Sequence, residues 1–170
     1  ALRRPAAKAA SLSKAAHLHK QKTAVPVTVR FSDATGIPAI PDNAPNAGPR
    51  GIALKFSLPD GSKTDIVGHS FNGFPVATAE EFRDFLLAIG ASGPDAPHPT
   101  AIEKFLGGHP AAATFVTAPK PAPVSYGTLA YFGVNTFKFT NAKGTVTFGR
   151  YQILPVGGEK LLTKEQASKM

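Results

Sequence analysis

The sequence predicts a mixed α+β fold in which antiparallel strands alternate with inserted helices. Three observations carry this prediction: alternating apolar residues at 25–32 and 135–154, a hairpin pattern over 51–71, and helical periodicity between residues 78 and 117. This order indicates either an α+β fold or a β-barrel with inserted helices. With about five strands, too few to close a barrel readily, the sheet should keep an open edge unless further chain exists.

The first predicted strand, residues 25–32, has two chemically different faces. Arg30 and Ser32 lie two positions apart, so their side chains point to the same side of a strand. The opposite side carries Val25, Val27, Val29 and Phe31. If the polar side faces a ligand cavity, Arg30 and Ser32 both point into it.

Residues 51–58 and 63–71 predict a hairpin, because Pro59-Asp60-Gly61 between them is a turn signal. Upstream, residues 6–20 are rich in alanine, leucine and lysine and predict one helix. The proline-rich stretch 33–49 should be irregular.

A helix should begin at Thr78, since Glu81 three residues later completes a capping box. It should run to Gly90 with one apolar stripe, formed by Phe82, Phe85, Leu86 and Ile89. Downstream, the pattern predicts two short helices at 99–107 and 110–117, strands at 135–141 and 145–154, and a helix start in the tail 161–170.

The composition is that of one globular domain, with 42% hydrophobic and 18% charged residues among 170. Because cysteine is absent, disulfides, thiolate nucleophiles and cysteine-ligated metals are excluded, while the compartment stays open between exported or periplasmic and cytoplasmic. The five histidines form no metal-binding motif, so we expect no protein-ligated metal site. No apolar run is long enough to span a membrane, and no membrane partner is expected.

The formal net charge of +8 raises the question of a polyanion partner. The basic residues are densest before residue 23, where alanines separate them, and no aromatic or helix-turn-helix motif accompanies them. A solvated basic face is therefore the preferred interpretation, and no nucleic-acid partner is expected.

Four segments form a pattern in fixed order. They read V-R-F-S at 29–32, P-R-G-I-A-L-K-F at 49–56, D-I-V-G-H-S-F-N-G-F at 65–74 and N-T-F-K-F-T-N-A-K-G at 135–144. Together they resemble the haem catalases and are most similar to the small catalase-related peroxidases, over about residues 8 to 160. The resemblance implies an antiparallel β-barrel of the catalase type, incomplete here, with inserted helices. It also implies one domain, residues 1–170, that lacks the N-terminal and C-terminal parts of the family domain.

The resemblance implies roles for several residues. Arg30 matches the arginine that pairs with a haem propionate, a task suited to a guanidinium that can bind a carboxylate through two hydrogen bonds. Ser32 matches the serine that hydrogen-bonds the distal histidine. Val67 matches a valine on the distal side, and Phe74 and Phe82 match phenylalanines that wall the pocket and channel.

His69 occupies the position where larger catalases place a distal asparagine that orients peroxide. A histidine there could donate one hydrogen bond and exchange a proton near neutral pH. Asn72 is a nearby amide that could take the place of the missing asparagine. The alternative is that His69 is a histidine of the strand with a structural role only.

Two family residues have no counterpart. The distal histidine belongs to an H-A-K-G run that His17 and His19 do not match, and the axial tyrosine belongs to an R-x-x-x-Y helix that Tyr126, Tyr131 and Tyr151 do not match. The chain is therefore expected to be a core fragment of a longer parent. The cofactor implied by the resemblance is haem b, held by an axial tyrosine outside this chain.

Three functions remain open. The first is a haem-dependent oxidoreductase that degrades hydrogen peroxide or organic hydroperoxides, with a small-molecule electron donor and possible homo-oligomers. Its activity is expected of the parent rather than of residues 1–170 alone. The second is a non-catalytic barrel that binds an apolar or anionic small molecule. The third is a basic module for nucleic acid or anionic surfaces.

Overall fold

The computed structural model describes residues 7–19, 23–44 and 46–169. The chain divides into two compact units. The sheet unit combines the residues up to Asn72 with those from Pro121 onward, and the helical unit comprises Gly73–Lys120.

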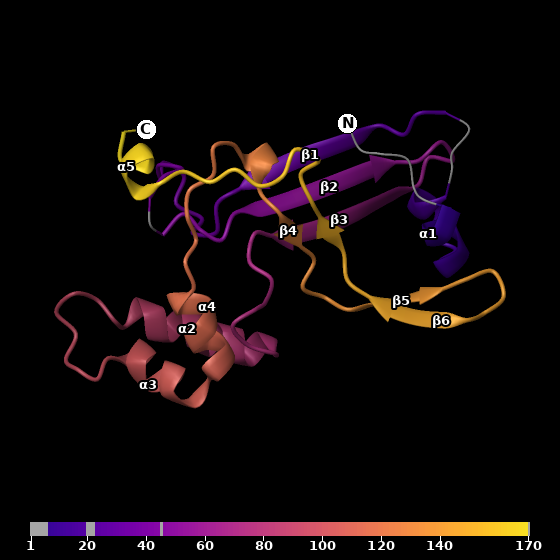
Figure 1. Cartoon of the computed structure of the whole chain (residues 1–170). Helices are drawn as coiled ribbons and strands as arrows, with labels where there is room; N and C mark the ends of the chain where they lie inside the picture. The colour runs from indigo at the N-terminus through magenta and orange to yellow at the C-terminus, as the bar shows by residue number, and fades with distance from the viewer. Residues whose placement is uncertain (1–6, 20–22, 45, 170) are drawn as a thin grey trace. The chain divides into compact units, whose positions relative to one another are not determined.

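The sheet unit is built on five antiparallel strands in the order β1-β2-β3-β4-β7 (Figure 1). The long strands are β1 (Val27–Ser32), β2 (Gly51–Ser57) and β3 (Lys63–His69), and the short ones are β4 (Tyr131–Phe132) and β7 (Gln152–Ile153). A second sheet is the hairpin of β5 (Phe137–Thr140) and β6 (Val146–Gly149). The mixed α+β class is confirmed. The described strands do not close into a barrel, and the larger sheet keeps the open edges expected from so few strands.

One face of the larger sheet carries the hydrophobic core. Buried side chains from β2 and β3 pack with residues that precede or form β4, and the cluster is Ile52, Leu54, Ile66, Leu129 and Tyr131. Each large apolar side chain buried in this way contributes roughly 1.5–3 kcal/mol. The core therefore fixes which face of β2 points inward, and hence which residues line the opposite face.

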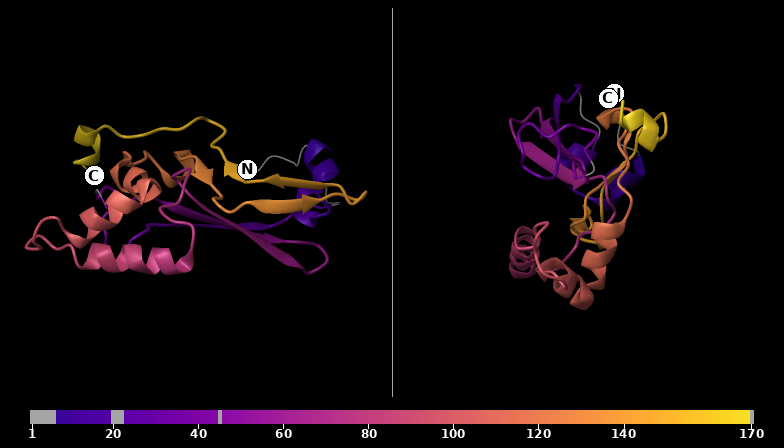
Figure 2. Two further views of the ribbon diagram at one scale, coloured as in Figure 1. Left: turned by 90° about the horizontal axis from the view of Figure 1, so that it is seen from below. Right: turned by 90° about the vertical axis from the view of Figure 1, so that its left-hand side faces the viewer.

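The helical unit contains α2 (Ala79–Gly90), α3 (Ala101–Gly108) and α4 (Pro110–Thr117), which lie together as one group (Figures 1 and 2). The capping box predicted at Thr78 and Glu81 is present. Aromatic rings form the centre, with Phe85 buried against Phe105 at a centroid distance of 5.7 Å. The predicted apolar stripe is only partly covered, since Leu86 and Ile89 are exposed.

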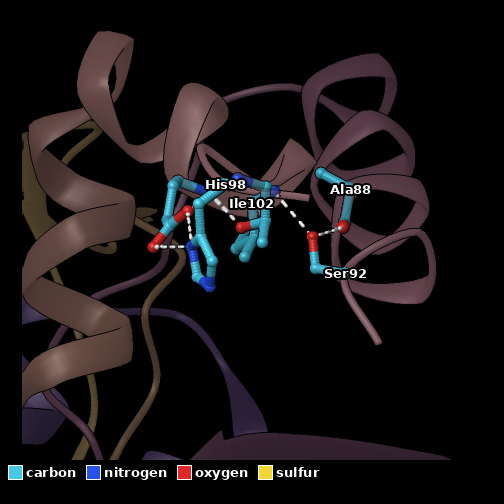
Figure 3. A network of polar contacts seen from close by, with 6 residues as sticks. Ala88, Ser92, His98 and Ile102 are labelled. Atoms are coloured by element: carbon cyan, nitrogen blue, oxygen red, sulfur yellow. Dashed lines mark hydrogen bonds and ion pairs between the residues drawn. The ribbon is translucent and has the colours of Figure 1, made fainter. Parts of the chain in front are cut away.

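Polar contacts join α2 to α3 (Figure 3). The Ser92 hydroxyl donates to the Ala88 carbonyl at 2.7 Å and accepts from the Ile102 amide at 2.9 Å. At the start of α3, the Glu103 carboxylate accepts from the Thr100 amide at 2.6 Å and pairs with His98 at 2.9 Å. The Ser92 contacts hold the beginning of α3 near the end of α2, and the Glu103 contacts cap the start of α3.

The single helix predicted over residues 6–20 is wrong. The described residues form α1 (Ala7–Leu12) and a separate short 3₁₀ turn (Ala16–Leu18). Between them, the Ser13 hydroxyl accepts from the Ala15 amide, and the Lys14 amide donates to the carbonyl of Thr140 at the end of β5. A tertiary hydrogen bond and a local serine turn thus outcompete helical propensity.

The strand predicted over 145–154 is also divided. It becomes β6 and β7, which belong to different sheets, because the chain changes partner around Tyr151, whose carbonyl accepts from the Gly133 amide at 2.9 Å. Strand β4 was not predicted, because a strand of two residues is too short to show an alternating pattern. The predicted tail helix is confirmed as α5 (Lys164–Ala167).

Candidate functional site

Four of the predicted site residues line one face of the larger sheet. In register across the three long strands, Arg30 lies opposite Ala53, and Ala53 lies opposite Val67. Directly opposed residues of antiparallel strands share a face. The face carrying Arg30 and Val67 is therefore the one that points away from the buried Ile52 and Leu54.

A second row runs parallel to the first. Ser32 lies opposite Gly51, and Gly51 lies opposite His69. Because side chains repeat every two residues along a strand, this row falls on the same face as the first. The result is a trough whose floor is Gly51 and Ala53. One wall is Arg30 and Ser32, the other is Val67 and His69, and the walls belong to strands about 9.5 Å apart.

The Ser32 side chain lies close to Gly51. A Cβ added at Gly51 would lie 2.5 Å from Ser32 Oγ, which shows that the serine hydroxyl extends over the floor of the trough. A glycine inside a strand often marks such an approach. The hydroxyl is therefore available to a group lying on that floor.

His69 is half-buried at the end of β3. Its Nδ1 accepts a hydrogen bond from the Phe71 amide at 3.3 Å, which places the hydrogen of the neutral ring on Nε2. Burial lowers the pKa of the ring, and hydrogen bonding to the Phe71 backbone makes a smaller, opposing contribution. The neutral Nε2–H form is thus the one favoured at neutral pH, and Nε2 itself is shielded from solvent.

The trough is open to solvent at Arg30 and Val67, whose side chains are both exposed. The Arg30 side chain is exposed, and Val67 is 66% exposed, which is unusual for a valine in the middle of a three-stranded arrangement. An exposed apolar wall beside a guanidinium suits a flat ligand with an apolar body and a carboxylate edge.

The remaining predicted residues lie elsewhere. Asn72 is exposed at the end of the sheet unit. Phe74 and Phe82 belong to the helical unit, where their rings pack with centroids 5.1 Å apart. That contact is compatible with simple core packing as well as with the pocket wall that the resemblance implies.

The three tyrosines provide a test of iron ligation. An iron-bound tyrosine must be deprotonated, so its site should favour the phenolate. Burial instead raises the pKa of Tyr151 and raises that of Tyr131 to about 12, and burial together with Asp33 and Asp42 raises that of Tyr126. Each hydroxyl is also engaged by protein, with the partners Asp33 and Asp42, the Tyr126 carbonyl, and His17. None of these three tyrosines therefore fits the axial ligand of a haem.

An apolar cavity of about 340 Å³ lies on the opposite face of the sheet. Its lining includes Val29, Phe31, Tyr126 and Tyr131. No local sequence pattern predicts this cavity, because its walls come from segments about a hundred residues apart. The trough floor was likewise not predicted, since its only sequence signal is a glycine at the start of a strand.

Within the described part of the chain, no group of three or more histidine or acidic side chains is placed to hold a metal ion. No helix among these residues is both long enough and apolar enough to cross a membrane.

Comparison with known families identifies relatives over nearly the whole chain. The model of the family described as Catalase matches residues 4–170, nearly the whole chain. The chain belongs to the catalase family. Its curated relatives include a catalase-related peroxidase of Mycolicibacterium paratuberculosis, 35% identical, with 94% of this chain and 50% of the relative covered. Another, from Synechococcus elongatus, is 38% identical, with 82% of this chain and 41% of the relative covered.

Solved structures show the same likeness. A bacterial catalase matches with a TM-score of 0.75 and 26% identity, over 94% of this chain and 31% of that chain. A fungal catalase matches with a TM-score of 0.76 and 22% identity, over 94% of this chain and 32% of that chain, which supports the fold alone. The chain spans about half the length, or less, of the curated relatives it matches.

Proposed function

We propose that this chain is part of a haem-dependent oxidoreductase that degrades hydrogen peroxide or organic hydroperoxides. The observation that carries the proposal is the trough, in which Arg30, Ser32, Val67 and His69 share one face around a floor of Gly51 and Ala53. A member of the catalase family would use haem b, which supplies the redox chemistry when bound. The protein's own contribution is to bind, orient and move protons.

Arg30 is proposed to hold the cofactor by a propionate. Its guanidinium is exposed and always charged, and it can form two parallel hydrogen bonds to a carboxylate. Val67 offers apolar surface beside it, and Ala53 between them is too small to block a flat ring. Phe74 and Phe82 are proposed to wall the pocket or channel.

Ser32 and His69 are proposed to act on the peroxide side. Ser32 Oγ extends over Gly51 and can accept or donate a hydrogen bond there. His69 would donate from Nε2 to a peroxide oxygen. Because Nε2 is shielded from solvent, this requires the ring to turn, and the 3.3 Å bond from Phe71 is long enough to be a weak restraint. Asn72 is the alternative amide donor.

The test is haem binding and peroxide consumption by the whole protein that contains this chain, because the tyrosines of the chain itself do not fit the axial ligand. Adding haem should give a saturable absorption band, and Arg30→Gln should weaken binding about tenfold or more, since hydrogen bonds to charged groups contribute about 1.5–3 kcal/mol. Arg83→Gln is the matched control, because Arg83 is exposed in α2 and pairs with Asp84. Equal haem affinity for the two variants would reject the role of Arg30, and a whole protein that neither binds haem nor consumes peroxide would reject the function.

The apolar cavity supports a second candidate, a non-catalytic protein that binds an apolar small molecule. Its lining of valine, leucine, isoleucine and aromatic side chains matches such a ligand. Two results together would favour this candidate over the first. Small aromatic compounds would displace a hydrophobic fluorescent probe from the chain, and the whole protein would show no peroxide turnover.

Three further features remain predictions. One is that residues 1–170 form a single core of a catalase-type barrel, which limited proteolysis can test by the absence of a stable cut between the units. Another is a small-molecule electron donor, testable by donor oxidation under peroxide. The third is a homo-oligomer, testable by sedimentation of the whole protein.

A further inference from the structure

Tyr126 has an unusual hydroxyl environment. It begins the 3₁₀ turn Tyr126–Thr128, and its hydroxyl donates to Asp33 Oδ1 at 2.5 Å and lies 3.1 Å from Asp42 Oδ1. Asp33 directly follows β1, and Asp42 lies in the loop before β2. An ionised carboxylate can only accept, so the direction of the short bond is from phenol to Asp33.

The other two tyrosines differ in their acceptors. Tyr131 donates to the backbone carbonyl of Tyr126 at 2.8 Å, and a carbonyl oxygen is not a base that can keep a proton in water. Tyr151 lies 3.0 Å from Nε2 of His17, in a contact whose direction depends on the histidine tautomer. Tyr126 is therefore the tyrosine whose hydrogen bond points to a charged base.

This arrangement is what one-electron oxidation of a phenol requires. Removing an electron from tyrosine makes its hydroxyl a strong acid, so the electron leaves readily only when a base within hydrogen-bond reach takes the proton. Burial and the two carboxylates raise the pKa of Tyr126, so the proton stays on the phenol until the electron is removed.

The ring of Tyr126 also has aromatic neighbours. Phe31 lies 5.5 Å from Tyr126 and 6.0 Å from Tyr131, measured between ring centroids, and all three line the apolar cavity. Phe31 belongs to β1 between Arg30 and Ser32. Tyr126 thus contacts the strand that forms one wall of the trough, from the opposite face.

We propose that Tyr126 is a redox site that supplies one electron to a one-electron oxidant while its proton moves to Asp33. The O–H bond of Tyr126 breaks, the carboxylate of Asp33 becomes a carboxylic acid, and the oxidant is reduced by one electron. A neutral phenoxyl radical remains on Tyr126, and a small organic reductant at the cavity would restore the phenol by donating one electron while the proton returns from Asp33. That this electron serves peroxide reduction rests on the proposed function; the redox property itself does not.

The experiment uses the 170-residue chain without haem or peroxide. Photogenerated tris(bipyridine)ruthenium(III) serves as the oxidant, the radical is recorded by electron paramagnetic resonance, and its rate of formation is measured by flash spectroscopy. We expect a tyrosyl radical in the unaltered chain that is lost in Tyr126→Phe and kept in Tyr131→Phe. Its formation should be slower in deuterated water, because a proton moves with the electron.

The carboxylates are tested separately. Asp33→Asn/Asp42→Asn keeps the shape but removes both bases, and should slow radical formation about tenfold or more, at the low end of what a positioned base contributes. Asp65→Asn is the control, since Asp65 is an exposed carboxylate paired with Lys55 on the hairpin. Its rate should match that of the unaltered chain.

Several results would overturn the proposal. They are a radical of unchanged yield in Tyr126→Phe, a radical that disappears only in Tyr151→Phe, or equal rates in the double variant and the Asp65→Asn control. Circular dichroism checks that each variant folds, and if Tyr126→Phe does not fold, the carboxylate comparison and the deuterium effect decide. The experiment contains no haem. Its result therefore does not depend on whether the proposed peroxide activity is correct.

Discussion

Gly68 and Gly51, in neighbouring strands, differ in what a larger side chain would contact. A Cβ at Gly68 would lie 2.8 Å from the backbone oxygen of Phe132, whereas one at Gly51 would meet the movable hydroxyl of Ser32. We expect Gly68→Ala to destabilise the chain by about 1–3 kcal/mol, because β4 must shift away from β3. Gly51→Ala should cost clearly less, since the serine side chain can rotate. Urea unfolding of both variants measures the difference, and equal losses would contradict the close approach of β3 to Phe132.

His69 should make stability depend on pH. Its pKa in the folded chain is lowered by burial, so folding favours the neutral ring. Its contribution is complete above the ordinary histidine pKa of about 6.5 and is lost as the pH falls through the lower folded pKa. The free energy of unfolding should therefore fall between pH 7 and pH 5, and less so in His69→Gln.

Burial also lowers the pKa of His17, which acts in the same direction. His17→Gln is therefore measured beside His69→Gln by urea unfolding at both pH values. If neither substitution reduces the loss of stability at pH 5, the two rings are not held neutral by the fold.

At the residue scale, sequence analysis found the walls of the trough but not its floor. Arg30 and Ser32 were readable because strand alternation places them on one face. That Val67 and His69 share this face followed only from the register between β2 and β3, which depends on the hairpin actually formed. The pairing of Tyr126 with Asp33, ninety-three positions away in sequence, had no local signal.

The helices are specified mainly by their ends. Thr100 is buried, accepts from the Glu103 amide and donates its own amide to the Glu103 carboxylate. We expect Thr100→Ala to cost about 1 kcal/mol, the usual value for a lost N-cap. Thr117→Ala, at the exposed end of α4, is the control and should stay within about 0.5 kcal/mol of the unaltered chain. Similar effects of both changes on helix content during thermal unfolding would argue against a structural role for this capping box.

Elements with strong end signals and long periodicity were therefore predictable, and those set by distant partners were not. Helix α2 was correct to its last residue because Thr78, Glu81 and Gly90 mark both ends. The segment 6–20 had high helical propensity but was divided by the hydrogen bond from Lys14 to Thr140. The division of 145–154 into β6 and β7 has the same origin, a change of partner strand that propensity does not encode.

At the scale of the whole chain, the two units have separate hydrophobic centres. Ile52, Leu54 and Tyr131 lie in the sheet cluster, while the helical unit is centred on Phe85, whose ring contacts those of three other phenylalanines. A unit with its own core can lose stability without its neighbour losing the same amount. The helical unit, with fewer than fifty residues, has the smaller core and should open first.

Phe85→Ala tests this directly. Phe85 is 4% exposed and contacts the rings of Phe82, Phe105 and Phe115, so its removal should cost about 3–5 kcal/mol in the helical unit. Leu87→Ala on the same helix is the control, because Leu87 is 64% exposed and should cost little. Amide hydrogen exchange should accelerate across α2, α3 and α4 in Phe85→Ala and change much less in β1, β2 and β3. Equal acceleration in both units would show that they unfold as one, and would favour the single core predicted from the sequence.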